Sequence, residues 1–215
     1  MDGCGLTHPI TVRPSDISRW VVQPSCAILK PVADVDQSVV EELVGNAHGN
    51  IARVRELLDA HPTALNLRAP WNETAVEAAT QMGDKAIIEL LIGRGAPIDF
   101  FTASVLGRMG DVKAELDADP SRVRARGVHD LPALYFAAIG GDLDVARRFL
   151  DAGADVNAAA ESAAPIHGAV IGGSAAMVRL LLEHGADPSL PDYKGRGARQ
   201  LAEDMGRRDL ADLFD

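Results

Sequence analysis

The stretch APIHGAVIGGSAAMVRLLLEHGAD, residues 164–187, decides the fold of this chain of 215 residues. It begins with small and apolar residues, continues with a glycine pair, and then places Val178, Leu181 and Leu182 at the i, i+3, i+4 spacing of an amphipathic helix. The stretch LPALYFAAIGGDLDVARRFLDAGADVN, residues 131–157, has the same order of features. Two helices joined by a glycine turn therefore recur along the chain, which is typical of a repeat protein.

The glycine expected between the two helices of each unit measures the length of the repeat. We place it at these positions: Gly49, Gly83, Gly110, Gly141, Gly173 and Gly206. The interval between Gly83 and Gly110 is the shortest, and the others lie close to the period of about 33 residues that is typical of one class of helical repeats. This period predicts six units over residues 37–215.

Both stretches resemble ankyrin repeats, whose pattern reads Thr-Pro-Leu-His-x-Ala-Ala-x-x-Gly and then Val-Val-x-Leu-Leu-Leu-x-x-Gly-Ala-Asp-Val-Asn. The resemblance implies an all-α, open solenoid of stacked helix-turn-helix units, about six repeats including the caps. A single unit of this kind cannot bury its own apolar face, so stability comes from stacking. The charged sixth unit, residues 197–214, suits a terminal cap that faces water.

Two units depart from the pattern. The third unit, residues 100–111, lacks the Thr-Pro-Leu-His start, and the short spacing before it leaves too few residues for a complete finger, the segment that links one unit to the next. The first unit is also loose, and in both units a proline, Pro62 or Pro120, follows the second helix in place of Gly-Ala-Asp. We therefore expect uneven curvature of the array near residues 96–126.

Residues 1–36 do not follow the period, and we interpret them as an N-terminal leader, irregular or extended, ahead of a repeat domain at 37–215. Four prolines exclude a long helix there: Pro9, Pro14, Pro24 and Pro31. Short extended segments are expected at 20–22 and 27–29. Two interpretations stay open, a simple leader and a segment that folds across the groove or recruits a partner.

Composition limits the function. The formal net charge of -10 disfavours nucleic acid and anionic membranes as partners, because neither is attracted to an acidic surface. The chain has no apolar run long enough for a membrane helix, no signal peptide pattern, and only two cysteines, Cys4 and Cys26. We therefore expect a cytoplasmic monomer whose partner is another protein, with a basic surface.

The resemblance also implies where a partner binds. In ankyrin repeats the finger tips and the inner faces of the first helices form the concave surface. The finger positions in this chain are Trp71, Glu73, Val128, His129, Leu131, Tyr193, Lys194 and Arg196. The solvent-facing positions of the first helices are Gln81, Met82, Arg108, Met109, Ile139, Ile171 and the pair Asp204–Met205.

Five of these residues are apolar and would form one stripe: Trp71, Met82, Met109, Ile139 and Ile171. An exposed apolar stripe on the concave surface predicts a protein-binding patch. The alternative is that some of these side chains turn inward and complete the core.

The sequence shows no pattern for catalysis, metal binding or a cofactor. Its six histidines are scattered without metal-ligand spacing, and His167 occupies the structural histidine position of the ankyrin pattern. Glu77, Tyr135 and His167 share one position of the first helix, so a small enzyme or a small-molecule-binding protein is the alternative function. We expect a non-catalytic adaptor or inhibitor instead; a deep pocket with perturbed titrating groups would favour the alternative.

Overall fold

Twelve α-helices form six successive pairs in the computed structural model, which describes residues 35–158 and 163–215. The first three pairs are α1 (Gln37–Asn46) and α2 (Ile51–Ala60), α3 (Ala75–Met82) and α4 (Lys85–Gly93), and α5 (Phe100–Val105) and α6 (Met109–Ala118). The last three are α7 (Ala133–Gly140) and α8 (Leu143–Asp151), α9 (Pro165–Gly172) and α10 (Ala175–Glu183), and α11 (Ala198–Asp204) and α12 (Arg208–Ala211). The described residues contain no strand, so the predicted all-α repeat fold is confirmed.

The leader is the part of the sequence analysis that the structure does not address. Residues 1–34, with both cysteines and the two expected extended segments, lie outside the described residues. Helix α1 begins at Gln37, while the division of the chain into leader and repeat domain stays a prediction.

Polar side chains at the turn start most of the second helices. The residues Asn50, Asp84, Asp142 and Ser174 precede α2, α4, α8 and α10, and each accepts a hydrogen bond from a backbone N–H of the first turn. Such caps pair donors that a helix otherwise leaves without partners. Arg108 and Arg207 hold the same position before α6 and α12 and provide no such bond.

Two units end their second helix at a proline, as the sequence indicates. Pro62 begins the 3-10 helix η2 (Pro62–Ala64) soon after α2, and Pro120 begins η3 (Pro120–Arg124) soon after α6. Two further 3-10 helices, η4 (Val128–Asp130) and η5 (Asp212–Phe214), lie in the finger before α7 and at the end of the chain.

The turn of the third unit lies earlier in the chain than predicted. Helix α6 begins at Met109, so Gly110 lies inside it, and Gly107 makes the turn with a φ of 70°. A left-handed backbone is costly for residues with a Cβ, so this turn favours glycine. The interval from Gly83 is therefore even shorter than predicted, and the interval to Gly141 is close to the normal period. The prediction of a turn at Gly110 is wrong. A Gly-Asp pair precedes α4 and α8, and the same pair occurs at 110–111, but there it lies inside α6.

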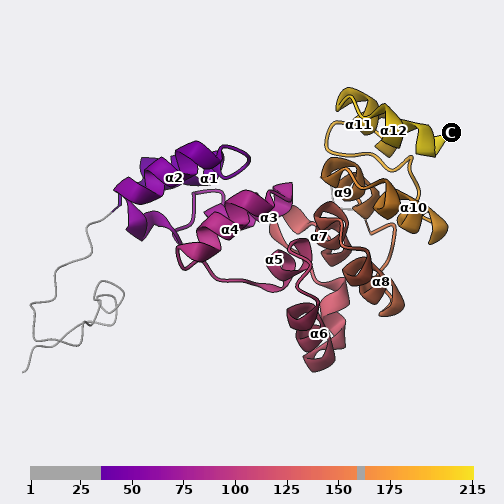
Figure 1. Ribbon diagram of the computed structural model, residues 1–215, viewed down its shortest axis with the longest axis horizontal. Helices are drawn as coiled ribbons and strands as arrows, with labels where there is room; N and C mark the ends of the chain where they lie inside the picture. The colour runs from indigo at the N-terminus through magenta and orange to yellow at the C-terminus, as the bar shows by residue number, and fades with distance from the viewer. Residues whose placement is uncertain (1–34, 159–162) are drawn as a thin grey trace, which may run out of the picture.

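The short third unit brings the second and fourth units into direct contact. The Tyr135 hydroxyl on α7 donates a 3.2 Å hydrogen bond to the backbone oxygen of Gln81 on α3. A Cβ added at Gly83 would lie 2.8 Å from Cγ1 of Ile139, so the approach of α7 to this turn depends on the missing side chain. Figure 1 shows the array turning at α5 and α6, where the sequence indicates uneven curvature.

This contact explains one wrong expectation about exposure. Ile139 is only 4% exposed and belongs to the apolar cluster of the first two units, together with Tyr135 and Phe136 of its own helix. A second cluster joins the third to sixth units. Ile139 is therefore part of the core, not of an exposed stripe.

Candidate functional site

Two neighbouring cavities lie on the side of the array that the fingers and first helices form. One has a volume of about 600 Å³ and is called the notch; the other, about 560 Å³, is called the apolar groove. Both are within the size range of ligand pockets. His129, in the finger before α7, lines both cavities, so they adjoin each other.

The notch exists because one finger is missing most of its length. Only the short segment 94–99 connects α4 to α5, whereas the much longer segment 61–74 connects α2 to α3. The long finger before α3 and the finger before α7 therefore face each other across the third unit. Residues from both fingers, from the segment 94–99, from α3, from α5 and from α7 line the cavity: Arg68, Trp71, Asn72, Glu73, Glu77, Thr80, Asp99, Phe101, Thr102, Arg126, Gly127, Val128, His129 and Phe136.

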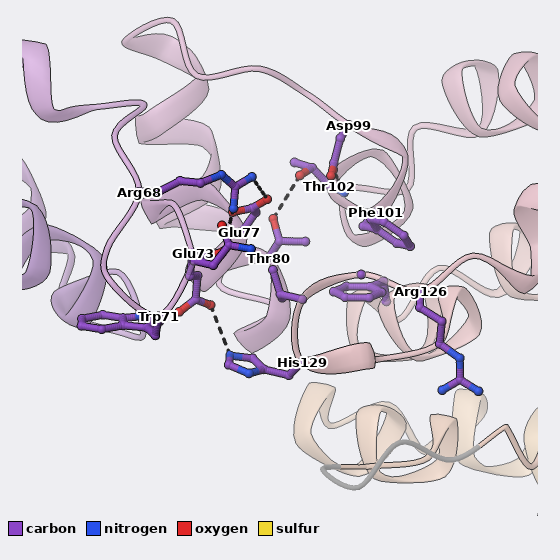
Figure 2. Close-up of a pocket in the computed structure, with 14 residues that line it drawn as sticks. Arg68, Trp71, Glu73, Glu77, Thr80, Asp99, Phe101, Thr102, Arg126 and His129 are labelled. Carbon is purple, nitrogen blue, oxygen red and sulfur yellow. Dashed lines mark hydrogen bonds and ion pairs between the residues drawn. The ribbon is translucent and has the colours of Figure 1, made fainter.

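Glu73 is the most buried charged group of the notch, with only 2% of its surface exposed. Its carboxylate accepts hydrogen bonds from the Trp71 indole N–H (2.9 Å) and from the Gln81 amide (3.0 Å). The Nε2 atoms of His48 and His129 lie 3.8 and 3.6 Å from its oxygens. Figure 2 shows Glu73 between Trp71 and His129. One carboxylate thus connects side chains of the first, second and fourth units.

Both ring nitrogens of His48 have hydrogen-bond partners. Nε2 lies 2.7 Å from the Gln81 amide nitrogen, and Nδ1 lies 3.3 Å from the backbone oxygen of Gly45. His48 therefore acts as a hydrogen-bond link to the first unit.

The other charged groups of the notch are mainly paired. Arg68 donates two hydrogen bonds, of 3.0 and 2.8 Å, to the carboxylate of Glu77. Arg126 donates to the backbone oxygen and carboxylate of Asp130. On the floor, the hydroxyls of Thr80 and Thr102 are 3.1 Å apart.

The apolar groove extends over four units. Three of its side chains are large, apolar and well exposed: Met82 (42%) on α3, Tyr193 (69%) in the finger before α11, and Met205 (41%) after α11. Its other lining residues are Gln81, His129, Leu131, Tyr135, Ala163, His167, Ile171, Asp192, Arg196, Leu201 and Asp204. Exposed methionine and tyrosine side chains are common at protein-binding surfaces.

One ion-pair network fixes the finger that carries Tyr193. The guanidinium of Arg196 donates to Asp192 (2.7 Å) and to Asp204 (2.8 Å). Burial alone raises the pKa of Asp192, but hydrogen bonds from Arg196 and from the backbone N–H groups of Arg196 and Lys194 hold that pKa below its usual range. The guanidinium N–H groups of Arg196 are therefore used within the protein, where they hold the finger in position.

The cavities bring together twelve of the sixteen residues predicted for the binding surface. Four of them line the notch, Trp71, Glu73, Val128 and His129, and nine line the apolar groove, with His129 in both: Gln81, Met82, His129, Leu131, Ile171, Tyr193, Arg196, Asp204 and Met205. Three of these lining residues are themselves buried: Glu73, Gln81 and Leu131.

Four predicted residues lie outside both cavities. Ile139 is buried against Gly83, as described above. Arg108 and Met109 flank the start of α6, because the true turn is at Gly107 and not at Gly110; Arg108 pairs with Asp111, and Met109 packs on the core. Lys194 is exposed, with its ammonium 5.3 Å from the centre of the Tyr193 ring.

Sequence reasoning missed most of the notch. Arg68, Thr80, Phe101 and Thr102 line it without matching any ankyrin position for binding. The short spacing before the third unit does indicate the incomplete finger, but the sequence pattern does not show which side chains this gap brings together.

The position that Glu77, Tyr135 and His167 share has a structural role. Glu77 accepts from the backbone N–H of Thr74, and Nδ1 of His167 accepts from the backbone N–H of Ala164, so each closes the start of its helix. The three residues do not line one cavity, since Glu77 is in the notch and the others are in the groove.

Comparison with known proteins agrees with this architecture. A family model of ankyrin repeats in three copies matches residues 111–192. Human BCL-6 corepressor-like protein 1 is 36% identical over 112 residues, which is 51% of this chain and 6% of that protein. Zygote-specific protein 3 of Chlamydomonas reinhardtii is 42% identical over 81 residues, 38% of this chain and 21% of that protein. The E3 ubiquitin-protein ligase KEG of Arabidopsis thaliana is 34% identical over 91 residues, 42% of this chain and 6% of that protein.

The repeating helix pairs and these matches show that the chain contains ankyrin repeats, and the family model places three of them within residues 111–192. Ankyrin repeats generally mediate protein–protein interaction and are typically non-catalytic. The chain spans at most about a fifth of the length of the three relatives. In the described part of the chain, no helix has the length and apolarity needed to cross a membrane, and no three metal-ligating side chains are grouped to hold an ion.

Proposed function

We propose that this chain is a non-catalytic binding module, an adaptor or inhibitor, that holds a partner protein along its apolar groove. The observation that carries the proposal is the exposure of Met82, Tyr193 and Met205 around one cavity. Exposing large apolar side chains together costs solubility, so a contiguous group of them marks an interaction site.

The form of the groove supports a protein as the occupant. Its walls come from α3, α7, α9 and α11, four separate first helices, so it follows the array as an extended surface. Its aspartate and arginine side chains pair with one another, since Arg196 pairs with both Asp192 and Asp204. Burial raises the pKa of the Tyr135 hydroxyl, and a phenol of that kind is a poor general acid or base at neutral pH.

The charge of the chain supports a basic partner. With a formal net charge of -10, the protein attracts a positively charged surface at long range and repels a second copy of itself.

Capture of a partner from the native host tests the proposal. The tagged wild-type protein is compared with the double variant Met82→Asp/Met205→Asp, which places two charges in the groove. We expect a protein that the wild type retains and the variant loses, because a buried unpaired carboxylate opposes binding.

Leu67→Asp is the matched control. Leu67 is exposed to a similar extent, 41%, but lines neither cavity. Circular dichroism establishes that all three proteins are folded. A partner that both variants retain equally, or no partner at low salt, contradicts the proposal.

A further inference from the structure

The notch has a chemical character of its own, distinct from that of the apolar groove. Among the described residues the polar partners of the Glu73 carboxylate are the Trp71 indole, the Gln81 amide and two histidines, and none is an arginine or a lysine. A carboxylate that is 2% exposed and lacks a permanent cation is costly, since burial removes its hydration. A positive group from outside would reduce this cost.

The charges around the notch also favour a positively charged ligand. Its lining residues include three carboxylates, Glu73, Glu77 and Asp99, against two guanidinium groups, Arg68 and Arg126. Arg68 is bound to Glu77 on both of its terminal nitrogens, and Arg126 donates to Asp130. Asp99 caps α5 through the backbone N–H of Thr102. The carboxylates of Glu73 and Asp99 would therefore repel an anion, whereas a cation would neutralise their charge.

Aromatic rings form two walls of the notch. Trp71, 47% exposed, lies on the side of the second unit, while the half-buried Phe101 lies on the other side, packed on the fully buried Phe136 with ring centres 4.9 Å apart. Figure 2 shows Trp71 and Glu73 on one side of the view and Phe101 on the other, with the Glu73 carboxylate pointing toward His129. Faces of aromatic rings attract cations, and a planar guanidinium also stacks on them.

We propose that the notch receives one arginine side chain of the partner protein, with its guanidinium bound by Glu73 and stacked against the aromatic walls. This proposal rests on the proposed function, because the notch adjoins the apolar groove at His129, and a partner segment lying in the groove can extend a side chain past His129. The guanidinium supplies several donors in one plane, which suits a carboxylate that lines a cavity and has lone pairs left to accept them.

A short peptide tests this chemistry without knowledge of the partner. The probe is acetyl-Gly-Arg-Gly-amide, and its neutral counterpart carries citrulline, which has nearly the same shape. The readout is the NMR signal of the Trp71 indole N–H, assigned with Trp71→Phe, because this N–H is bonded to Glu73 and the chain has only two tryptophans.

We expect the arginine peptide to shift this signal with millimolar affinity and the citrulline peptide to bind at least about tenfold more weakly, the difference that one charge-assisted contact makes. We expect Glu73→Gln to weaken the affinity for the arginine peptide by about tenfold or more. Glu89→Gln, which removes the same charge from an exposed position on α4 outside the notch, leaves the affinity unchanged. Trp71→Leu, read out on backbone amide signals, keeps the carboxylate and weakens binding several-fold.

Equal binding of the arginine and citrulline peptides overturns the proposal, and so does a folded Glu73→Gln protein that binds the arginine peptide as the wild type does. The capture experiment separates the two proposals. A partner lost by Met82→Asp/Met205→Asp but held with unchanged affinity by Glu73→Gln leaves the groove function standing and removes the notch as its arginine site. Loss of the partner on Glu73→Gln, with Glu89→Gln unaffected, supports both.

Discussion

Ile139 shows how one side chain can connect units that are not neighbours in sequence. It packs where Gly83 has no side chain, so the fourth unit closes directly onto the second. The hydrogen bond from Tyr135 to the backbone of Gln81 lies on the same interface. Stability at this point depends on side chains that the repeat pattern alone assigns to the surface.

Replacement of Ile139 by alanine tests this burial. We expect a loss of about 2–5 kcal/mol in the free energy of unfolding, the usual cost of removing a buried isoleucine or leucine side chain, measured by urea denaturation. Leu181→Ala, at a fully buried position of α10, serves as the reference and should lose a similar amount. A change under about 0.5 kcal/mol at Ile139 is the value typical of a surface position and would contradict the interface.

A second residue-scale prediction concerns His167, which is 0% exposed. Burial lowers its pKa below the ordinary value, and the nearby Asp192 opposes this effect without reversing it. As the pH falls below about 6.5, the unfolded chain therefore takes up a proton before the folded chain does, and stability falls.

We expect the free energy of unfolding to be lower at pH 5.5 than at pH 7.5, by at most about 1.4 kcal/mol per pH unit from this group. The variant His167→Asn keeps an acceptor for the Ala164 N–H and should lose part of this pH dependence. The other histidines are identical in the two proteins, so the comparison isolates His167. Identical slopes for the two proteins would contradict the account.

At the scale of helices, α6 differs from its equivalents in how it begins. Asp84 caps α4 with φ and ψ of -77° and 85°, and Arg108 has nearly the same backbone angles, -77° and 70°, without a capping side chain. The backbone before α6 thus has the conformation of an N-cap position, but the arginine there has no side-chain oxygen that could accept the capping hydrogen bond.

Arg108→Asn should therefore stabilise the protein. A new N-cap contributes about 0.5–2 kcal/mol, and the ion pair of Arg108 with Asp111 that is lost is exposed and worth little. Urea denaturation of Arg108→Asn and Arg108→Ala separates the two effects, since only asparagine can cap. Equal stability of the two variants would show that no cap forms.

The elements also show what a sequence pattern can and cannot locate. The second, fourth, fifth and sixth turns lie at the predicted glycines, since these stand at the end of a regular apolar pattern. The third does not, because Gly107 and Gly110 both fit locally and only backbone geometry decides between them. The same error places Arg108 and Met109 on the predicted binding surface.

For the molecule as a whole, the fold and the general position of the site follow from sequence, because fingers and first helices recur at fixed positions in each unit. The notch and the burial of Ile139 do not, because both result from a missing finger that changes which units touch. Shortening of the third unit changes the contacts between the second and fourth units, and the pattern of a single repeat does not predict such a change.

The net charge leads to a prediction for the whole molecule. We expect the affinity for the captured partner to fall about tenfold or more between roughly 50 and 500 mM NaCl, since salt screens attraction between an acidic protein and a basic surface. Binding measured by calorimetry over this range is the test. An affinity that rises with salt would indicate a partner held without charge complementarity.

The most direct test of the groove uses the five methionines as probes. Met82 and Met205 line the groove, Met177 is fully buried, Met109 packs outside both cavities, and Met1 precedes the described residues. With the methionine methyl groups labelled with carbon-13, NMR spectra are recorded with and without the captured partner. We expect the signals of Met82 and Met205 to shift or broaden while those of Met109 and Met177 stay in place. Unchanged signals of Met82 and Met205 in the saturated complex would contradict binding in the groove.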